Sequence, residues 1–500
     1  MDFLDPKKRR AYHIRLVVGY ILVGIVIGLA TIIIVYGANG YGINTKTGQI
    51  VQNGLLFLDS NPTGAEVYLN GQDRHTTTSA RLILPGGTYT LTLKKSGYRD
   101  WSNSFTLNGS SVARYVYPFL FPVKPLVTKL QTYDSAPKLV TQSPSQRWLL
   151  VENNKASSLV PTFDEYDTTT LDDASPAVQQ ISMPSGLLTD YSASSKLKVV
   201  EWSTDNNNVL IKHTYGKHTE FVVFNRAKPD QSFNVNKMFD TTPTLVNLFN
   251  KKTSQLYIYQ SDGSLQLGDT STKKLAAPIL KNVLAYKPYG TDLITYVTDN
   301  GEPSGMVEAR IWNNGQTYGL YEFKAGEHYL IDMAQYSGHF YYVAGSDKAD
   351  RINIYEDPLN DIKNPSVGKA LPMIAMVDPG ADKLGFSTNA RFVGAESGQR
   401  FAVYDFETQT LYQYSIKNPL AADLSWMDGH RLIGESKSEV FVMDYDGTNK
   451  QVIDPTSNDT GALFSADYHH MLTVAPGSKG SAVLEDIDMR AGVDLPNSKQ

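Results

Sequence analysis

The chain contains histidines that could ligate a metal ion, and their positions decide which of them could act together. His213 and His218 flank a Thr-Tyr-Gly-Lys segment that is typical of a hairpin loop, across which two imidazoles could ligate one metal. We favour two exposed loop histidines, because no carboxylate partner is apparent. His469 and His470 are adjacent in a predicted strand, so their side chains should point to opposite faces and cannot serve one site.

Acidic residues offer two further candidates for cation binding. Residues 164–167 (DEYD) and 172–173 (DD) are predicted as a solvated loop, with weak cation binding as the alternative. Residues 444–449 (DYDGTN) resemble part of a calcium loop. An EF-type loop needs Gly at its sixth position and an acid at its twelfth, whereas Gly447 is fourth here and Pro455 is twelfth. We therefore predict a hairpin turn at this segment.

The common catalytic motifs are absent from the sequence. It contains no Gly-x-Ser-x-Gly, no His-Glu-x-x-His and no Gly-x-x-x-x-Gly-Lys, and the lack of cysteine excludes thiolate chemistry. With 46 Lys and Arg against 51 Asp and Glu, the net charge is −5, which argues against a nucleic-acid partner. We predict a protein that is not an enzyme, with no catalytic, cofactor-binding or metal-ligating residue, no cofactor, and ligand-binding residues that the sequence leaves unknown.

The elements that would carry any site are predicted to be strands. Thirty tyrosines, many Thr and Val residues, and Asn-Gly or Asp-Gly pairs favour strands joined by tight turns. Five hundred residues suit two or three domains, and without disulfides their stability must come from hydrophobic cores. The predicted fold class is an all-β ectodomain that follows one N-terminal transmembrane helix.

Residues 16–36 form an uncharged, almost wholly apolar segment that matches the ~20 helical residues needed to cross a bilayer. Basic residues at 7–10 and Arg15 precede it, which predicts a cytoplasmic tail at residues 1–15 and an extracytoplasmic C-terminal part. A cleaved signal usually has a shorter apolar part and a small residue where Tyr36 stands. We therefore expect a single-pass anchor in the cell membrane, cleavage being the alternative.

A small β domain is predicted next to the membrane, after a flexible spacer at residues 37–53. In the strand at residues 88–94, Tyr89, Leu91 and Leu93 alternate with threonines, which is typical of a half-buried strand. Turns are predicted at residues 61–64, at Asn70-Gly71 and at residues 85–87.

This segment resembles a PEGA domain over about residues 54–121. The resemblance rests on Ser60-Asn-Pro62 and on the segments 64–71 (GAEVYLNG), 84–89 (LPGGTY) and 95–98 (KSGY). The sequence departs from the family at residues 62–65, which read PTGA, and at 77–78, where Thr-Thr replaces the usual Thr-Pro. The resemblance implies a small β-sandwich of surface proteins that contacts the envelope and is not known for catalysis.

From residue 138 a four-strand pattern recurs, with units that start near 138, 198, 244, 283, 330, 386, 423 and 462. A spacing of ~40–50 residues suits the blades of a β-propeller. The segments 426–429 (WMDG), 464–467 (FSAD) and 443–449 (MDYDGTN) resemble turns of TolB-type propellers, which implies a rigid binding platform. We predict a linker at 122–137, a propeller of seven or eight blades at 138–490 and a C-terminal tail at 491–500.

Three functions are consistent with this organisation. The first is a non-enzymatic, membrane-anchored binding or scaffolding protein of the cell envelope, with the propeller as recognition platform and the small domain as stalk or wall contact. Its partner would be cell-wall polysaccharide or an envelope protein. The second is an exported propeller enzyme that acts on glycans through two carboxylates at the channel mouth. The third is an accessory subunit of a membrane complex.

Overall fold

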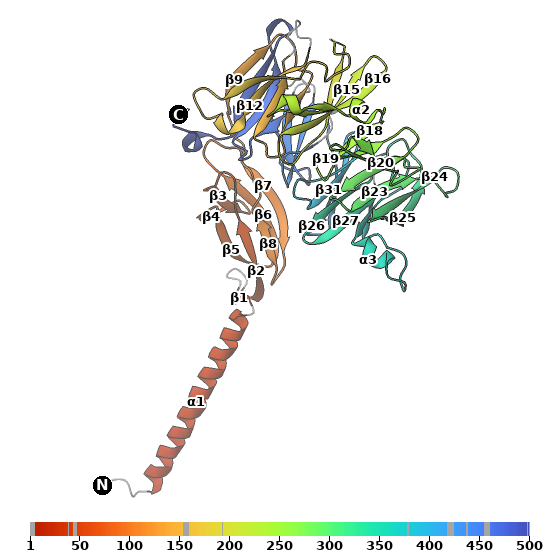
Figure 1. The fold of residues 1–500 in the computed structure, drawn as a ribbon. Helices are drawn as coiled ribbons and strands as arrows, with labels where there is room; N and C mark the ends of the chain where they lie inside the picture. Colours follow the sequence, from red (N-terminus) through yellow and green to blue (C-terminus); the bar gives the residue numbers. More distant parts are fainter. Residues whose placement is uncertain are drawn as a thin grey trace. The chain divides into compact units, whose positions relative to one another are not determined.

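The computed structural model describes residues 6–38, 40–43, 48–153, 160–192, 194–377, 380–417, 425–436, 439–454, 461–497 and 499. The chain divides into two compact units, Met1–Val123 and Lys124–Gln500 (Figure 1). The described part of the chain consists mostly of strands that form four-stranded sheets, as the composition predicts.

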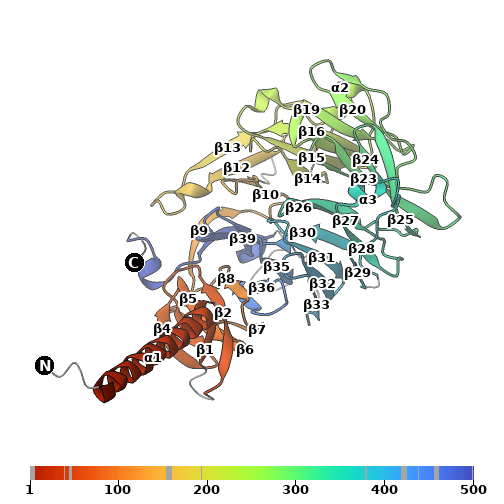
Figure 2. The ribbon, with the colours of Figure 1, turned by 90° about the horizontal axis from the view of Figure 1, so that it is seen from below.

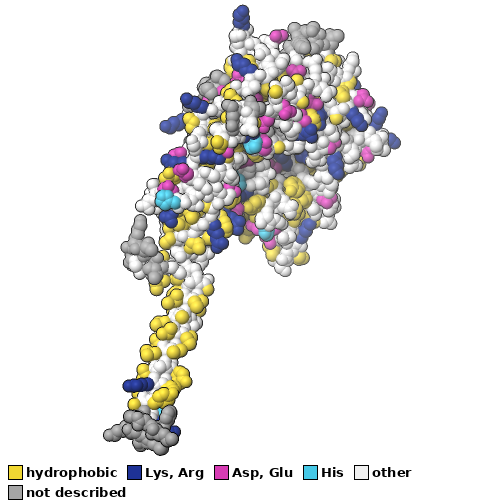
Figure 3. Space-filling model, turned by 90° about the vertical axis from the view of Figure 1, so that its left-hand side faces the viewer, with side chains coloured by type: hydrophobic (Ala, Val, Ile, Leu, Met, Phe, Trp, Pro, Cys, Tyr) yellow, Lys and Arg dark blue, Asp and Glu magenta, His cyan; other side chains and the backbone are white. Residues whose placement is uncertain are grey.

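The first unit begins with helix α1, Pro6–Ala38, which is long and apolar enough to cross a membrane. It includes the predicted span at residues 16–36. Its hydrophobic side chains are exposed along its length (Figure 3), so nothing in the described protein covers them. A helix of this kind near the N-terminus serves as a membrane anchor or a signal sequence.

Two four-stranded sheets follow α1 in the first unit. One consists of β1 (Tyr41–Ile43), β2 (Ile50–Leu58), β5 (Ala80–Pro85) and β8 (Val112–Tyr115), and the other of β3 (Glu66–Leu69), β4 (Gln72–Thr77), β6 (Gly87–Lys94) and β7 (Trp101–Leu107). Leu56, Leu58, Leu91, Leu93 and Trp101 are buried. The alternation predicted for the strand at 88–94 is confirmed, because Leu91 and Leu93 are buried while the threonines on either side are more exposed.

The predicted spacer at residues 37–53 is partly wrong. Tyr41–Ile43 pairs with Ile50–Gln52, so this segment adds a short strand to the first sheet. The Gly, Asn and Thr content of the segment favours a flexible chain, but backbone hydrogen bonds between the two paired strands hold it in place. Residues 39 and 44–47 of the spacer lie outside the described residues.

The second unit contains eight four-stranded sheets among its described residues, and in the first four the strands follow in chain order. Sheet 1 has β10 (Val140–Gln142), β11 (Trp148–Glu152), β12 (Thr162–Asp167) and β13 (Val178–Ser182). Sheet 2 has β14 (Lys196–Trp202), β15 (Asn208–Tyr215), β16 (His218–Asn225) and β17 (Phe233–Asn234). Sheet 3 has β18 (Leu245–Phe249), β19 (Lys252–Tyr259), β20 (Leu265–Asp269) and β21 (Lys274–Leu275). Sheet 4 has β22 (Ala285–Tyr289), β23 (Leu293–Thr298), β24 (Met306–Asn313) and β25 (Gln316–Lys324).

Sheets 5 to 7 repeat this order, and sheet 8 departs from it. Sheet 5 has β26 (Asp332–Tyr336), β27 (His339–Ala344), β28 (Ile352–Glu356) and β29 (Ile374–Met376). Sheet 6 has β30 (Lys383–Phe386), β31 (Phe392–Ser397), β32 (Arg400–Asp405) and β33 (Thr410–Ser415). Sheet 7 has β34 (Ser425–Trp426), β35 (Arg431–Ser436), β36 (Glu439–Asp444) and β37 (Gln451–Asp454). Sheet 8 has β38 (Leu463–Phe464), β39 (His470–Pro476), β40 (Ala482–Asp488) and β9 (Leu126–Tyr133). Two short helices, α2 (Val235–Phe239) and α3 (Pro358–Ile362), lie in connections.

Strand β9 corrects the predicted linker at residues 122–137. It pairs antiparallel with β40, from Tyr133 opposite Ala482 to Leu126 opposite Asp488. The first strand of the second unit therefore completes the last sheet. Only Tyr133 of this strand is buried, which explains why its apolar pattern is weak in the sequence.

Neighbouring sheets pack face to face, and alternate residues of one strand contact different neighbours. In β15, Val209 and Ile211 pack in one cluster with residues of sheet 1, while Leu210 packs in another with residues of sheet 3. Because both faces of the middle strands are buried, these strands are continuously apolar. The core is thus divided into layers between consecutive sheets.

The sheets contact one another in chain order, and the last contacts the first. Trp202 of β14 donates a hydrogen bond to Thr141 of β10, at 2.9 Å, and Gln142 of β10 donates one to the carbonyl of Phe464 in β38, at 2.8 Å. Figure 2 shows β10, β14, β26 and β30 toward the middle of this unit and β25, β29 and β33 at its rim. The first strands of these four sheets therefore lie on the inner side of the unit.

Candidate functional site

A cavity of about 420 Å³ lies against the first strands of sheets 4, 6 and 7, and we call it the inner pocket. Its lining includes Tyr286 and Lys287 of β22, Lys383 and Gly385 of β30, and Trp426 of β34. Each first strand contributes only one or a few side chains. The pocket therefore exists only when sheets far apart in the sequence are assembled.

Two glycines make space beside the aromatic wall of the inner pocket. Gly385 and Gly394 pair across β30 and β31. A Cβ atom on Gly385 would meet no other atom within 4 Å, whereas one on Gly394 would lie 3.7 Å from the indole of Trp426. The indole Nε1 of Trp426 donates a hydrogen bond to the Gly385 carbonyl at 3.3 Å. This hydrogen bond fixes the indole ring beside backbone that carries no side chains.

Both lysines that line the inner pocket form ion pairs. The Nζ atom of Lys383 lies 3.2 Å from Glu396, whose side chain is almost fully buried, and the Nζ atom of Lys287 lies 3.7 Å from Asp332. Glu396 also lines the cavity, while Asp332 lies behind Lys287 at the start of β26. The pocket therefore presents two ammonium groups whose positions are fixed by ion pairs with carboxylates.

Burial sets the protonation behaviour of Asp332. Removal from water raises the pKa of this carboxyl, although the ammonium of Lys287 and the backbone N–H of Met333 act in the opposite direction. Lys287 and Met333 thus offset part of the effect of burial on the pKa of Asp332.

A hydrogen-bond chain continues from Tyr286 toward sheets 3 and 2. The Tyr286 hydroxyl donates to Asn247 of β18 at 2.8 Å, and the Asn247 amide donates to Glu201 of β14 at 3.1 Å. Glu201 also forms an ion pair with Lys251. Glu201, Asp332 and Glu396 thus each hold one lysine. Paired donors and acceptors beside an indole ring suit hydrogen bonding and stacking with a polar ligand.

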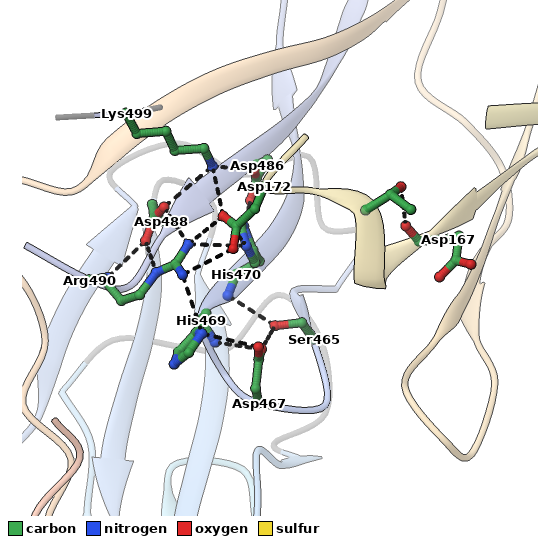
Figure 4. A network of polar contacts seen from close by, with 11 residues as sticks. Asp167, Asp172, Ser465, Asp467, His469, His470, Asp486, Asp488, Arg490 and Lys499 are labelled. Carbon is green, nitrogen blue, oxygen red and sulfur yellow. Dashed lines mark hydrogen bonds and ion pairs between the residues drawn. The ribbon is translucent and has the colours of Figure 1, made fainter. Parts of the chain in front are cut away.

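A second polar cluster lies where sheet 8 contacts sheet 1, and we call Asp172, His470, Asp486, Asp488, Arg490 and Lys499 the closing cluster (Figure 4). The Arg490 guanidinium bridges Asp172 and Asp488, with Nη2 at 2.6 and 2.9 Å from their oxygens. Lys499 lies 3.3 Å from Asp488. The cluster therefore links the connection after β12 to strand β40 and the residues that follow it.

The closing cluster includes a potential metal-ligand set, because Asp172, His470 and Asp488 offer ligand atoms within 4.8 Å of one another. The side chains of Arg490 and Lys499 already neutralise these carboxylates, so the arrangement needs no added cation. His339, Glu356 and Asp357 form a similar set on sheet 5, where the imidazole Nδ1 lies 2.7 Å from Asp357 and 3.1 Å from Glu356. Ion pairing of the imidazole with both carboxylates explains why these three side chains lie close together.

The prediction that His469 and His470 cannot serve one site is wrong. His469 Nδ1 lies 3.4 Å from Nη1 of Arg490, and His470 Nε2 lies 3.3 Å from Nη2 of the same guanidinium. His469 precedes β39, which begins at His470, so strand alternation does not apply to the pair. Their shared partner is an arginine.

The hairpin predicted between His213 and His218 is confirmed, since Tyr215 and His218 are paired at the turn. His218 is exposed, but the interpretation of His213 as an exposed loop residue is wrong. Its imidazole is fully buried, and Nδ1 lies 2.8 Å from Glu220, which stands opposite it in the register. The two histidines therefore do not form a joint metal site.

The prediction of a solvated loop at residues 164–167 is also wrong. These residues belong to β12, where burial of both strand faces encloses even the acidic side chains. Glu165 forms a buried ion pair with Arg226 at 2.7 Å, and Asp167 is held by Arg147 at 2.7 Å. At residues 444–449 the predicted turn is confirmed, because the Asp444 N–H donates to the Thr448 carbonyl at 2.9 Å.

None of the inner-pocket residues was identified from the sequence. They come from several repeat units, and the register between units is set only by packing. The one available signal was the recurrence of a charged residue in the first strand of several units, as with Glu201, Lys287 and Lys383.

Comparison with known proteins gives a partial assignment. Residues 53–117 match the model of the PEGA domain, which agrees with the resemblance seen in the sequence. This match covers the two sheets of the first unit except β1 and the first residues of β2, and it leaves the second unit without a family. No curated protein matches the chain.

Solved structures resemble the chain only distantly. A computationally designed protein named Ika8 is 11% identical, with coverage of 71% of this chain and 98% of that chain and a TM-score of 0.41. A chain of a mitotic checkpoint complex is 10% identical, with coverage of 74% and 93% and a TM-score of 0.34. An oligogalacturonate lyase in complex with manganese is 10% identical, with coverage of 75% and 99% and a TM-score of 0.39. At these scores the likenesses carry no argument about this chain.

Proposed function

We propose that the protein is a non-enzymatic, membrane-anchored binding protein of the cell envelope. In this proposal α1 is an uncleaved anchor, the PEGA-like domain is a stalk or wall contact, and the second unit is an eight-bladed propeller. Sequential contact of the sheets and the pairing of β9 with β40 support the propeller. The PEGA match fits an extracytoplasmic location.

The observation that carries the proposal is the inner pocket. Its lysines are held by carboxylates, and Trp426 is fixed beside a glycine pair. Fixed donors, acceptors and an aromatic ring favour recognition of a polar ligand, because little side-chain freedom is lost when the ligand binds. Cell-wall polysaccharide fits this chemistry, and a segment of an envelope protein is the alternative partner.

The proposal is tested by sedimentation of the purified full chain, in detergent, with isolated cell-wall sacculi. We expect the wild type to pellet with sacculi, and Trp426→Ala and Lys383→Ala to weaken this binding at least tenfold. Lys324→Ala is the matched control, because Lys324 is an exposed lysine on the edge strand β25.

Either of two results would contradict polysaccharide recognition at the inner pocket. One is wild-type protein that stays in the supernatant, which would direct attention to protein partners in washed membranes. The other is equal binding by the wild type and the two pocket variants. Release of shortened glycan from the sacculi, abolished in Glu396→Gln, would instead support the enzyme hypothesis.

A further inference from the structure

The outer face of the first sheet in unit 1 carries an apolar row across three strands, half-buried at its centre and exposed at both ends. Leu55 of β2 stands opposite Ile83 of β5 on one side and Val112 of β8 on the other. Ile83 is 65% exposed and Val112 is 53% exposed. The core residues Leu56 and Leu58 point to the opposite face of the same sheet, so this row is not needed to complete the domain core.

The next row on this face consists of an aromatic ring between two arginines. Phe57 stands opposite Arg81 of β5 and Arg114 of β8. The two guanidinium carbons lie 6.0 and 5.3 Å from the centroid of its ring, in cation–π contacts. Neither guanidinium has an ion-pair partner among the described residues. Two positive charges are therefore available next to an apolar row, and we call these six residues the basic-apolar face.

The chain connects this sheet closely to the end of α1. The helix ends at Ala38 and β1 begins at Tyr41, while the rings of Tyr36 and Tyr41 pack with centroids 5.2 Å apart. Tyrosines are enriched at the level of lipid headgroups, so the start of the first sheet lies at the membrane interface if α1 spans the bilayer. Leu55 lies only three residues beyond Gln52, the partner of Tyr41, on strand β2.

We propose that the basic-apolar face docks on the anionic phospholipid surface of the membrane that α1 spans. This inference goes beyond the proposed ligand binding and rests on its assignment of α1 as an anchor. Arg81 and Arg114 contact lipid phosphates, and the Val112–Leu55–Ile83 row enters the boundary between headgroups and acyl chains. Two charges without carboxylate partners favour an anionic surface over an apolar protein groove, in which they would be desolvated.

The test uses the full chain inserted in nanodiscs. Because the chain has no cysteine, an Ile83→Cys variant can be labelled at one site with the environment-sensitive fluorophore NBD. Thr88→Cys, at an exposed position of β6 in the other sheet, is the matched control. Emission is compared between nanodiscs of phosphatidylcholine alone and nanodiscs that also contain phosphatidylglycerol.

We expect a blue-shifted emission and protection from an aqueous quencher at position 83 in the anionic nanodiscs, and no such change at position 88. In an Arg81→Glu/Arg114→Glu background the shift should be lost, with an unchanged circular dichroism spectrum as the check on folding. Equal emission at position 83 in both kinds of nanodisc would overturn the proposal. A blue shift that persists in the Arg81→Glu/Arg114→Glu background would also overturn it, because the face would then be covered without a contribution from its charges. Failure of the chain to enter nanodiscs would instead disprove the anchor.

Discussion

Buried charged residues in the second unit are stabilised by specific partners, and Glu220 is a clear case. Its carboxylate accepts hydrogen bonds from Thr189 and Asn234 and contacts the His213 imidazole. Burial by itself would raise the pKa of Glu220, but these contacts together lower it to about 2. The carboxylate is therefore kept ionised in the interior.

Glu220→Gln should lower the free energy of unfolding at neutral pH by about 2 kcal/mol, because the amide must place a donor where the carboxylate accepts hydrogen bonds. Urea unfolding monitored by circular dichroism measures this change. Glu322→Gln, at an exposed position of β25, is the control and should leave the stability within experimental error.

The same pair of proteins should differ in their response to acid. Since folding lowers the pKa of Glu220, its contribution is fully present above the usual glutamate pKa of 4.5 and is lost as the pH falls toward about 2. The stability difference between wild type and Glu220→Gln should therefore shrink over this interval. A difference that stays constant from neutral pH to pH 2 would contradict the lowered pKa.

Local sequence information limited the prediction of these residues. The hairpin between His213 and His218 was predicted, and its register places Glu220 opposite His213. The pair was missed because burial of both strand faces cannot be recognised from polar residues. The partners of Glu165 and Asp172, which are Arg226 and Arg490, lie far away in the sequence and could not be identified without the fold.

At the scale of elements, the sequence predicted the repeating strands well, but it did not predict the pairing of β9 with β40 that completes the last sheet. Units predicted to start near 138, 198, 244 and 283 correspond to β10, β14, β18 and β22, which begin at residues 140, 196, 245 and 285. Apolar strands followed by polar turns are a local signal. Strand β9 lacks such a signal, because it is an exposed edge strand whose partner β40 comes from the other end of the chain.

We expect Tyr133→Ala to be strongly destabilising. Tyr133 is the buried residue of β9 and packs in one cluster with Leu149 and Val151 of sheet 1 and Leu472 and Val474 of sheet 8. Loss of its ring should cost about 3 kcal/mol, because the cavity opens between two sheets.

Val127→Ala tests the same strand at an exposed position and should change the stability by less than about 0.5 kcal/mol. Thermal unfolding of both variants provides the comparison. If the two variants had equal stability, β9 would not be an integral part of sheet 8.

At the scale of the whole molecule, the chain combines one apolar helix with two β units of different kinds. The basic residues before the apolar part of α1 predict that the N-terminus is cytoplasmic and that both β units are exported. This orientation is open to a direct test because every introduced cysteine is unique.

A cysteine at position 350 should react with a membrane-impermeant maleimide in intact cells whose outer layers admit the reagent. Asp350 is strongly exposed, so its replacement should not disturb the fold. A cysteine at position 10, in place of the exposed Arg10, should react only after the membrane is permeabilised. The reverse pattern would show that the β units face the cytoplasm.

The pairing of β9 with β40 has a mechanical consequence. The first unit is joined to the second at Lys124, and the next regular element is β9. If α1 is held in a membrane while a ligand is held by the second unit, tension passes through the first unit and then reaches the β9–β40 ladder before any other sheet of the second unit. The Tyr133 ring is buried at the far end of this ladder, so it must leave the core before β9 separates from sheet 8.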